Sequence, residues 1–403
     1  MNGLVGIVIL FAVAYFLSEK KSAIRWRTVG VAFALQVSIA AIVFGLPAGR
    51  SALEWASNQV TMAISAGKDG VDFLFGGLTR GQPEVGFVFA LQVLPMIIFF
   101  SSLIAVLYHL KIMDIIIRLL GGLLKKMLGT SRAESLSAAA NIFVGQTEAP
   151  LVVKPYIANM TRSELFAVMV GGLASVAGSI LAGYVLLGVK IEYLIAASFM
   201  AAPGGLLFAK LLIPETERPD ESRKDFAEGE NKPTNVLDAA AFGASTGLQL
   251  ALNVGAMLLA FIGLIALLNL LLGGLGNWFG ANNWSLQAVL GHAFRPVAWM
   301  IGVPWHDAIR GGSLIGQKLV LNEFVAYIQY VEWMKSFSNK TQAICAVALC
   351  GFANLSSIAI LLGGLGSMAP NRRSDIARLG IKAVLAGTMS NLMSAAIVGL
   401  WVI

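Results

Sequence analysis

Two acidic side chains stand in stretches of this sequence that are otherwise apolar. Glu148 lies within 145–150, beside an amide, a hydroxyl and a proline that cannot continue a helical hydrogen-bond ladder. Glu323 follows Asn322 in the C-terminal half of the chain. A carboxylate in the middle of a membrane costs on the order of 3 kcal/mol, so such a residue usually has a partner, an ion or a substrate. We therefore interpret the two glutamates as the centres of one polar site.

The side chains near these glutamates favour a neutral solute that combines a ring with hydroxyl groups. Amides and carboxylates can bond to the edge of a heterocycle, and a carboxylate with an amide can hold sugar hydroxyls. A phenylalanine can pack against the face of such a ring, although core packing explains it equally well. Either glutamate could instead form a structural ion pair, with Lys154 or Arg310 as its partner. The polar set is Gln146, Thr147, Asn354, Ser356 and Ser357, with Phe352 beside it.

A second group of residues could bind a small hard cation such as sodium. Sodium takes oxygen ligands, and transporters supply them from side chains and from backbone carbonyls where helices unwind. Asn141 and Ser175 have suitable side chains, and Val144 and Val176 could contribute backbone oxygens. The same asparagine and serine could equally join neighbouring helices by hydrogen bonds. Both interpretations stay open on the sequence alone.

The composition indicates which kind of protein positions these residues. The chain of 403 residues is 57% hydrophobic and 13% charged, whereas a soluble domain carries roughly 25% charged residues. It is therefore an integral membrane protein, and its 43 glycines suit close helix packing better than the alternating strands of a β-barrel. The net charge of +7 indicates cytoplasmic anchoring, and no basic stripe with interleaved aromatics points to nucleic acid. Cys345 and Cys350 lie in one apolar run and are expected to be packed thiols.

The apolar runs predict an all-α integral membrane protein with eight transmembrane helices, each near the ~20 residues that cross a bilayer. We expect spans at 3–17, 29–46, 85–110, 163–187, 191–213, 239–272, 341–365 and 381–403. A surface helix is expected at 51–65, an interfacial amphipathic helix at 111–128 and a charged soluble loop at 214–232. Two further segments, 133–160 and 284–330, are apolar but interrupted by proline, glycine and polar residues. They predict two re-entrant helical hairpins, because irregular backbone survives at membrane depth only where protein or a cavity satisfies it.

Charge and an internal repeat give this fold an orientation. Most of the 29 Lys and Arg residues fall in segments that share one side of the membrane if both chain termini are outside. Residues 172–180 align with 351–359, so that Ser175 matches Asn354, and an interrupted acidic segment precedes each unit. An odd number of predicted crossings separates the two units, which gives them opposite topology. Secondary transporters contain such inverted repeats, with discontinuous helices that meet near the midplane.

Four motifs resemble those of the concentrative nucleoside transporters, and most closely those of the bacterial sodium-coupled members. They are Gly-Gln-Thr-Glu-Ala-Pro at 145–150, Gly-Leu-Ala-Ser at 172–175, Val-Leu-Asn-Glu-Phe-Val-Ala-Tyr at 320–327 and Cys-Gly-Phe-Ala-Asn-Leu-Ser-Ser at 350–357. The resemblance covers essentially the whole chain. It implies a transporter rather than an enzyme, assembled as a homotrimer in which each scaffold surrounds a moving transport domain.

The resemblance also implies how the chain is divided. Residues 1–110 would carry the first three scaffold helices and the outer surface helix, and 239–275 the long sixth helix of the scaffold. Residues 111–238 would form the first repeat of the transport domain, with the interfacial helix, the first hairpin and helices four and five. Residues 276–403 would form the second repeat, with the second hairpin and helices seven and eight. The protein would lie in lipid in the bacterial inner membrane.

Carried over by motif, the resemblance implies three groups of site residues. The nucleobase would contact Gln146, Thr147, Glu148, Ile180 and Phe352. The ribose would be held by Glu323, Asn354 and Ser357, and sodium by Asn141, Val144, Ser175 and Val176. Ile180 is larger than the residue usual at its place in the family, which leaves the preference between purine and pyrimidine open. Proton-coupled relatives tend to carry Gly-Gln-Ser-Glu-Asn at the first tip, so Thr147 favours sodium.

We therefore expect a sodium-coupled symporter that imports nucleosides such as uridine by alternating access. One alternative is a proton-coupled carrier, or a carrier of the free nucleobase, which would bind a competitor without ribose equally well. Another is an intramembrane enzyme that uses the two glutamates. That enzyme would need a nucleophile or a metal constellation, and the sequence contains neither.

Overall fold

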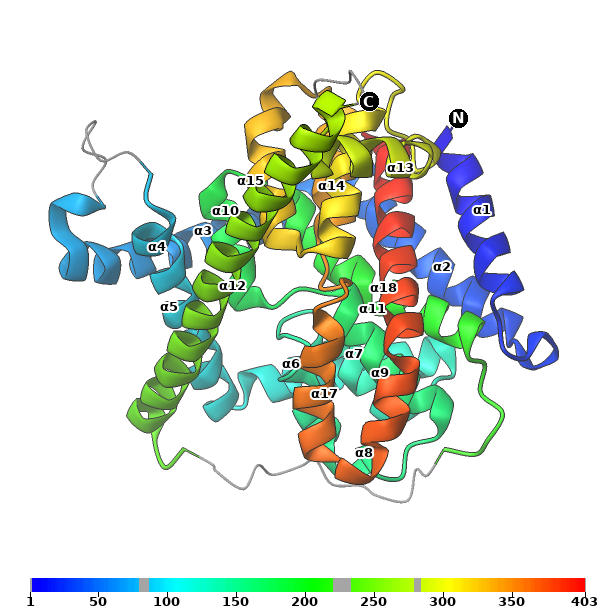
Figure 1. The fold of residues 1–403 in the computed structure, drawn as a ribbon. Coiled ribbons are helices and arrows are strands. Elements are labelled where there is room, and N and C mark those ends of the chain that lie inside the picture. Colours follow the sequence, from blue (N-terminus) through cyan, green and yellow to red (C-terminus); the bar gives the residue numbers. More distant parts are fainter. Residues whose placement is uncertain (1, 80–86, 220–232, 279–283, 403) are drawn as a thin grey trace.

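The computed structural model describes residues 2–79, 87–219, 233–278 and 284–402, which Figure 1 shows as a ribbon. Every regular element in these ranges is helical. Both chain ends lie at the same end of the molecule, at the top of Figure 1. The α-helices are α1 (Asn2–Phe16), α2 (Trp26–Ala40), α3 (Pro47–Phe75), α4 (Phe89–Gln92), α5 (Leu94–His109), α6 (Ile112–Leu128), α7 (Arg132–Ala140), α8 (Lys154–Ile157), α9 (Arg162–Ala174), α10 (Gly178–Leu187), α11 (Ile191–Leu212), α12 (Val236–Trp278), α13 (Leu286–Met300), α14 (Ala308–Val320), α15 (Glu323–Trp333), α16 (Asn339–Leu349), α17 (Ser357–Met368) and α18 (Arg373–Trp401).

Six segments in the described ranges are long and apolar enough to cross a membrane, and burial divides them into two groups. The most apolar parts of Arg162–Leu187, Ile191–Leu212 and Pro370–Trp401 are 94%, 89% and 83% buried inside the protein. The corresponding parts of Trp26–Gly45, Phe89–His109 and Val236–Gly276 are only 28%, 22% and 11% buried. Apolar surface of this extent does not face water in a soluble protein. The chain is a multi-pass membrane protein with a buried helical centre and an apolar periphery.

Two of the predicted spans are interrupted helices. The span predicted at 163–187 divides into α9 and α10, with extended backbone at Ser175. A capping box starts this span, because the Thr161 hydroxyl accepts from the Glu164 amide while the Glu164 carboxylate accepts from the Thr161 amide. The span predicted at 341–365 divides in the same way into α16 and α17. Each break leaves the last carbonyls of a helix without intrahelical partners, at the depth of the buried centre.

The first predicted hairpin, 133–160, consists of α7, a run of turns, a 3-10 helix (Ala149–Val153) and α8. A second capping box begins α7, since the Ser131 hydroxyl accepts from the Glu134 amide and the Glu134 carboxylate accepts from the Ser131 amide. Pro150 lies in the first turn of the 3-10 helix, where its missing N–H leaves no helical bond unmade. The irregular backbone between these helices carries the polar tip.

The structure differs from the prediction of one interrupted segment at 284–330. A separate helix, α13, comes first, and α14 and α15 are the two arms of the predicted hairpin. The two helices α13 and α14 pack closely, because a Cβ added at Gly312 would lie 2.7 Å from the backbone of Arg295 and Phe294. The glycines that suggested an interruption instead allow two continuous helices to approach each other.

Three other predicted helices are present with nearly the same or longer bounds. The interfacial helix expected at 111–128 is α6. The surface helix expected at 51–65 is the longer α3, and the span expected at 239–272 is the longer α12. Both cysteines are buried and free, as expected. Most of the charged loop predicted at 214–232 lies outside the described residues.

The elements of the two halves follow one another in the same order. An amphipathic helix (α6, α13) precedes the first arm of a hairpin (α7, α14), the second arm, a broken helix (α9 and α10, α16 and α17) and a long helix (α11, α18). The first two elements pack together in each half. In Figure 1, α14 and α15 lie in the upper half of the molecule and α8 in the lower half. The same order of elements in the two halves is what an internal repeat predicts, and it begins upstream of the aligned motifs.

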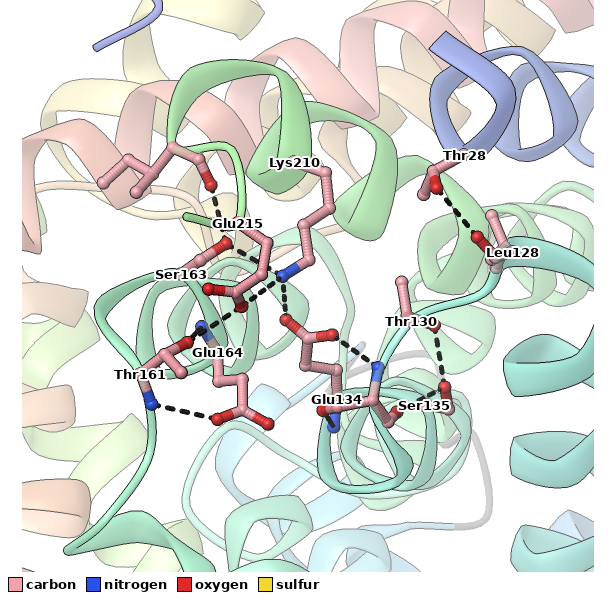
Figure 2. A network of polar contacts seen from close by, with 12 residues as sticks. Thr28, Leu128, Thr130, Glu134, Ser135, Thr161, Ser163, Glu164, Lys210 and Glu215 are labelled. Carbon is pink, nitrogen blue, oxygen red and sulfur yellow. Dashed lines mark hydrogen bonds and ion pairs between the residues drawn. The ribbon is translucent and has the colours of Figure 1, made fainter. Parts of the chain in front are cut away.

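A buried lysine joins three elements of the first half, as Figure 2 shows. The Lys210 ammonium, on α11, forms an ion pair with Glu134 of α7 and donates to Ser163 Oγ of α9 at 2.8 Å. Its Nζ lies 3.6 Å from Glu215, which in turn accepts from the Thr161 hydroxyl at 2.9 Å. The carboxylate that caps α7 is thus the one that binds the lysine. This network fixes the starts of the hairpin and of the broken helix against α11.

Candidate functional site

Glu323 begins α15, and both of its carboxylate oxygens accept hydrogen bonds inside the protein. Tyr184 Oη donates to Oε1 at 3.0 Å, and Asn354 Nδ2 donates to Oε2 at 3.2 Å. Arg310, the alternative partner suggested by the sequence, instead donates to Ser336 Oγ at 2.8 Å. The carboxylate is therefore held by neutral donors, which leaves its charge available to a solute.

Asn354 lies in the break between α16 and α17 and organises the residues around it. Its Oδ1 accepts from Ser356 Oγ at 2.7 Å and from the Ser357 amide at 2.9 Å, which satisfies a donor at the start of α17. Its Nδ2 donates to Glu323 on the other side. The structure thus brings together the three residues predicted to hold ribose, and all three are buried.

The tip of the first hairpin contacts the broken helix of the second half. Gln146 Nε2 donates to Ser357 Oγ at 3.3 Å. Gln146 also lies against α9, since a Cβ added at Gly172 would lie 2.8 Å from the Cβ of Gln146. Thr147 lies against α17, where a Cβ added at Gly364 would be 3.0 Å from its methyl carbon. The first-half residues predicted to contact a base therefore adjoin the second-half residues predicted to hold a sugar.

The two helix breaks are joined by a backbone hydrogen bond. The Phe352 amide donates to the Ser175 carbonyl at 3.0 Å. The Phe352 side chain is 8% exposed and belongs to the main buried core together with Ile180. Ile180 lies one turn before Tyr184 on α10, whose hydroxyl reaches Glu323. The Phe352 backbone therefore lies where the breaks meet, and Ile180 lies in the first turn of the helix that follows the first break.

Three acceptor oxygens near the first tip have no hydrogen-bond partner among the described residues. They are Asn141 Oδ1, Gln146 Oε1 and Glu148 Oε2. Buried acceptors are nearly always paired, and leaving one unpaired costs about 1–3 kcal/mol. The nitrogen atoms of the two amides are both used, since Asn141 Nδ2 donates to the Ser137 carbonyl at 2.9 Å and Gln146 Nε2 to Ser357. The free oxygens can accept donors from a solute or coordinate a cation.

The four residues predicted to bind sodium lie where α7 and α9 end. Asn141 is the C-cap of α7 and packs on α9, since a Cβ added at Gly171 would lie 3.0 Å from its Nδ2. Ser175 is the C-cap of α9, and its Oγ donates to the Gly171 carbonyl at 3.0 Å. Val144 and Val176 are buried beside them in the chain. Helix C-termini carry partial negative charge and free carbonyls, so two of them in one place suit a small cation.

Some polar side chains at the site were not identified from the sequence. Tyr184 lies in a span that is otherwise apolar, and its ring centroid is 4.8 Å from that of Phe324 and 4.4 Å from that of Tyr327. Lys318 and Asn391 are buried beside the helix breaks. Lys318 and Asn391 lie in helices that contain other polar residues, such as Gln317 and Ser390, so the sequence does not single them out or reveal which partners they reach.

Three family models together match most of the chain. Residues 5–78 match the N-terminal model of the Na⁺-dependent nucleoside transporters, and residues 193–399 match the C-terminal model of the same family. Residues 90–190, between them, match a model named Gate and described as nucleoside recognition. This last range includes the first hairpin and the broken helix α9 and α10.

Several known proteins are similar to the chain. YutK of Bacillus subtilis, an uncharacterised transporter, is 59% identical over 402 residues, which are 99% of this chain and 99% of that protein. The nucleoside permease NupC of Helicobacter pylori is 52% identical over 407 residues, covering 99% of this chain and 97% of its own. Human sodium/nucleoside cotransporter 1 is 38% identical over 411 residues, which are 98% of this chain and 63% of the human protein.

Solved structures of CNTnw have the same fold. The inward-facing, substrate-bound state is 60% identical, with a TM-score of 0.95, and the match covers 99% of this chain and 97% of that one. One intermediate state has a TM-score of 0.97 and covers 100% and 98%. The named relatives are transporters and permeases rather than enzymes. By its sequence along the full length and by its fold, the chain belongs to the concentrative, sodium-dependent nucleoside transporter family.

Proposed function

We propose that this protein is a sodium-coupled symporter that imports nucleosides such as uridine. The observation that carries the proposal is the meeting of two half-sites, in which Gln146 bonds to Ser357 while Glu323 bonds to Asn354. One half offers free amide and carboxylate oxygens, and the other a carboxylate paired with an amide. A nucleoside presents both a ring with hydrogen-bonding edges and a set of sugar hydroxyls, so it matches both halves.

Each half-site takes one part of the nucleoside in this proposal. Gln146, Thr147 and Glu148 contact the edge of the base, which packs against Ile180 and Phe352. The unpaired oxygens Gln146 Oε1 and Glu148 Oε2 accept from N–H groups of the base or from O–H groups of ordered water. Glu323, Asn354 and Ser357 bind the ribose hydroxyls. A site built to bond hydroxyls binds a solute without them poorly, because its buried polar groups are then left unpaired.

Sodium binds at the ends of α7 and α9 in this proposal, through oxygens of Asn141, Val144, Ser175 and Val176. The unpaired Asn141 Oδ1 supports the assignment, since it has a free lone pair in a buried place. Asn141 stands at the end of the helix that leads into the tip with Gln146. The ion therefore stabilises the same tip that contacts the base, and each ligand favours the binding of the other.

Transport follows from moving this site across the membrane. The proposed scaffold is 1–110 with 239–275, the transport domain is 111–238 with 276–403, and together they form eight transmembrane helices and two re-entrant hairpins. The high burial of α9 to α11 and α18, against the exposure of α2, α5 and α12, supports this division. Exposed apolar faces on the scaffold leave room for lipid and for the partners of a homotrimer.

The proposed location is the bacterial inner membrane, with both termini outside. Three of the segments predicted to be cytoplasmic lie together, since Glu19 lies 2.9 Å from Arg162 and 3.0 Å from Lys382. Positive charge concentrated on one side of a membrane protein marks its cytoplasmic face.

Uptake of labelled uridine into proteoliposomes tests the function. We expect accumulation with an inward sodium gradient and its collapse when choline replaces sodium at fixed pH. Unchanged uptake in choline would assign the coupling to protons instead. Uracil that competes as well as uridine would identify a carrier of the free nucleobase, because the ribose half-site would then contribute nothing.

A further inference from the structure

The second half of the molecule contains a buried ammonium group where α14 and α16 end. Lys318 lies in the last turn of α14 and is 3% exposed. Its Nζ donates to the Ala348 carbonyl at 2.8 Å and to Asn391 Oδ1 at 2.6 Å. A basic side chain this deep in an apolar protein is costly, so it marks a place where the protein uses the group.

Asn391 on α18 extends this contact to both broken helices. Its Nδ2 donates to the carbonyl of Ala174, the last residue of α9, at 2.6 Å, and to that of Cys350, the C-cap of α16, at 3.0 Å. The approach is close, because a Cβ added at Gly351 would lie 2.3 Å from Asn391 Oδ1. Lys318 therefore binds the oxygen of an amide whose nitrogen caps two helix ends.

The first half has the same arrangement of helix ends, but it has Asn141 where the second half has Lys318. α7 ends beside α9 as α14 ends beside α16, so two negatively polarised helix ends meet in each half. Asn141 stands shortly before the tip glutamate Glu148, as Lys318 stands shortly before Glu323. Within the part of the chain that the structure describes, Asn141 Oδ1 has no partner, whereas the acceptors in the second half are bonded to the ammonium.

We propose that the Lys318 ammonium is a tethered cation, which does in the second half what a sodium ion does in the first. It neutralises two helix ends and braces the tip that carries Glu323. The inference rests on the proposed function, since it takes the site at Asn141 to be the sodium site. Only the first half then needs a free ion, and the ribose half-site is braced at every stage of transport. Lysine suits the role, with three donors, no acceptor and a stem that reaches from α14.

Chemical rescue tests the proposal. Lys318→Ala removes the ammonium and leaves space beside the Ala348 carbonyl and Asn391 Oδ1. We expect sodium-driven uridine uptake to fall at least about tenfold, as for the loss of hydrogen bonds from a charged group. Methylammonium should restore uptake in proportion to its concentration. The methionine of Lys318→Met is similar in length but carries no charge and leaves no space for the amine. Uridine uptake by this variant should therefore fall, and methylammonium should not restore it. Wild type and Lys335→Ala, at an exposed lysine after the same hairpin, should also not respond to the amine.

Two results would overturn the proposal: wild-type uptake by Lys318→Met, or a folded and inactive Lys318→Ala protein that methylammonium leaves unchanged. If instability abolishes uptake, the melting temperature in detergent can report binding of methylammonium instead. Methylammonium should raise it for Lys318→Ala and leave it unchanged for Lys318→Met, and no rise would count against the tethered cation. Wild-type uptake that ignores sodium would overturn the proposed coupling alone, because the amine response is read separately in the alanine variant.

Discussion

Glu323→Gln separates a role in binding ribose from a role in holding the fold. The glutamine can keep its neighbours, since its amide oxygen can accept from Asn354 while its amide nitrogen donates to the Tyr184 hydroxyl, which rotates to accept. What it loses is charge toward the solute. A hydrogen bond to a charged group contributes about 1.5–3 kcal/mol, so we expect the Kd for uridine to rise about 10- to 150-fold.

The measurement is calorimetric titration of the purified protein in saturating sodium, with uridine and with 2′,3′-dideoxyuridine. The dideoxy compound lacks the 2′ and 3′ hydroxyl groups of the ribose. If Glu323 binds those hydroxyls, wild type and variant should bind the dideoxy compound with similar low affinity. Glu323→Gln causes one loss of binding free energy for uridine and another for the dideoxy compound. The difference between these two losses is the coupling between the carboxylate and the hydroxyls, as in a double-mutant cycle.

A matched control is Glu332→Gln, the same change on an exposed face of the same helix, α15. It should leave both affinities unchanged. Equal losses of affinity for uridine and the dideoxy compound in Glu323→Gln, with a lower melting temperature, would refute the reasoning. Glu323 would then stabilise the helix break and not contact the sugar.

Three more substitutions address the ion, the missed tyrosine and the helix break. Asn141→Ala removes an unpaired acceptor, so the sodium concentration for half-maximal uptake should rise about tenfold; a defect that excess sodium cannot reverse would argue against this site. Tyr184→Phe keeps the ring but removes one donor to the Glu323 carboxylate, so KM for uridine in uptake assays should rise about fivefold, and an unchanged KM would exclude a contribution. Gly351→Ala places a Cβ 2.3 Å from an asparagine of α18 and should lower the free energy of unfolding by about 1–3 kcal/mol. Gly363→Ala, which meets open space, is its control in thermal unfolding, and equal melting temperatures would contradict the close approach.

Much of the site could be predicted because burial of a carboxylate is rare enough to be informative. Glu148 and Glu323 stood out for that reason, and the repeat then placed Asn354 with the second of them. In the structure Asn354 Nδ2 donates to Glu323 Oε2 at 3.2 Å. The capping box at Thr161 was also predictable, since it depends only on local spacing.

Two kinds of feature could not be predicted from the sequence: the structural role of a glycine, and contacts between residues far apart in the chain. A glycine in an apolar run can mark a break or a close helix contact, and the sequence does not distinguish them, so α13 was merged with the hairpin. Gly312 proved to be a contact. The partners of Lys318 and Asn391 lie on helices far away in the chain, and no local pattern encodes such a meeting.

The bond between the Phe352 amide and the Ser175 carbonyl has a consequence for how specificity can change. It joins the two halves at the centre of the site, yet it uses only main-chain atoms. Any residue other than proline at 352 can supply the donor, and every residue at 175 can supply the acceptor. The side chain at 352 is therefore free to vary with the solute, while the crossing and the proposed sodium ligand Ser175 remain. A carrier with a different base preference can arise here by side-chain replacement without rebuilding the frame.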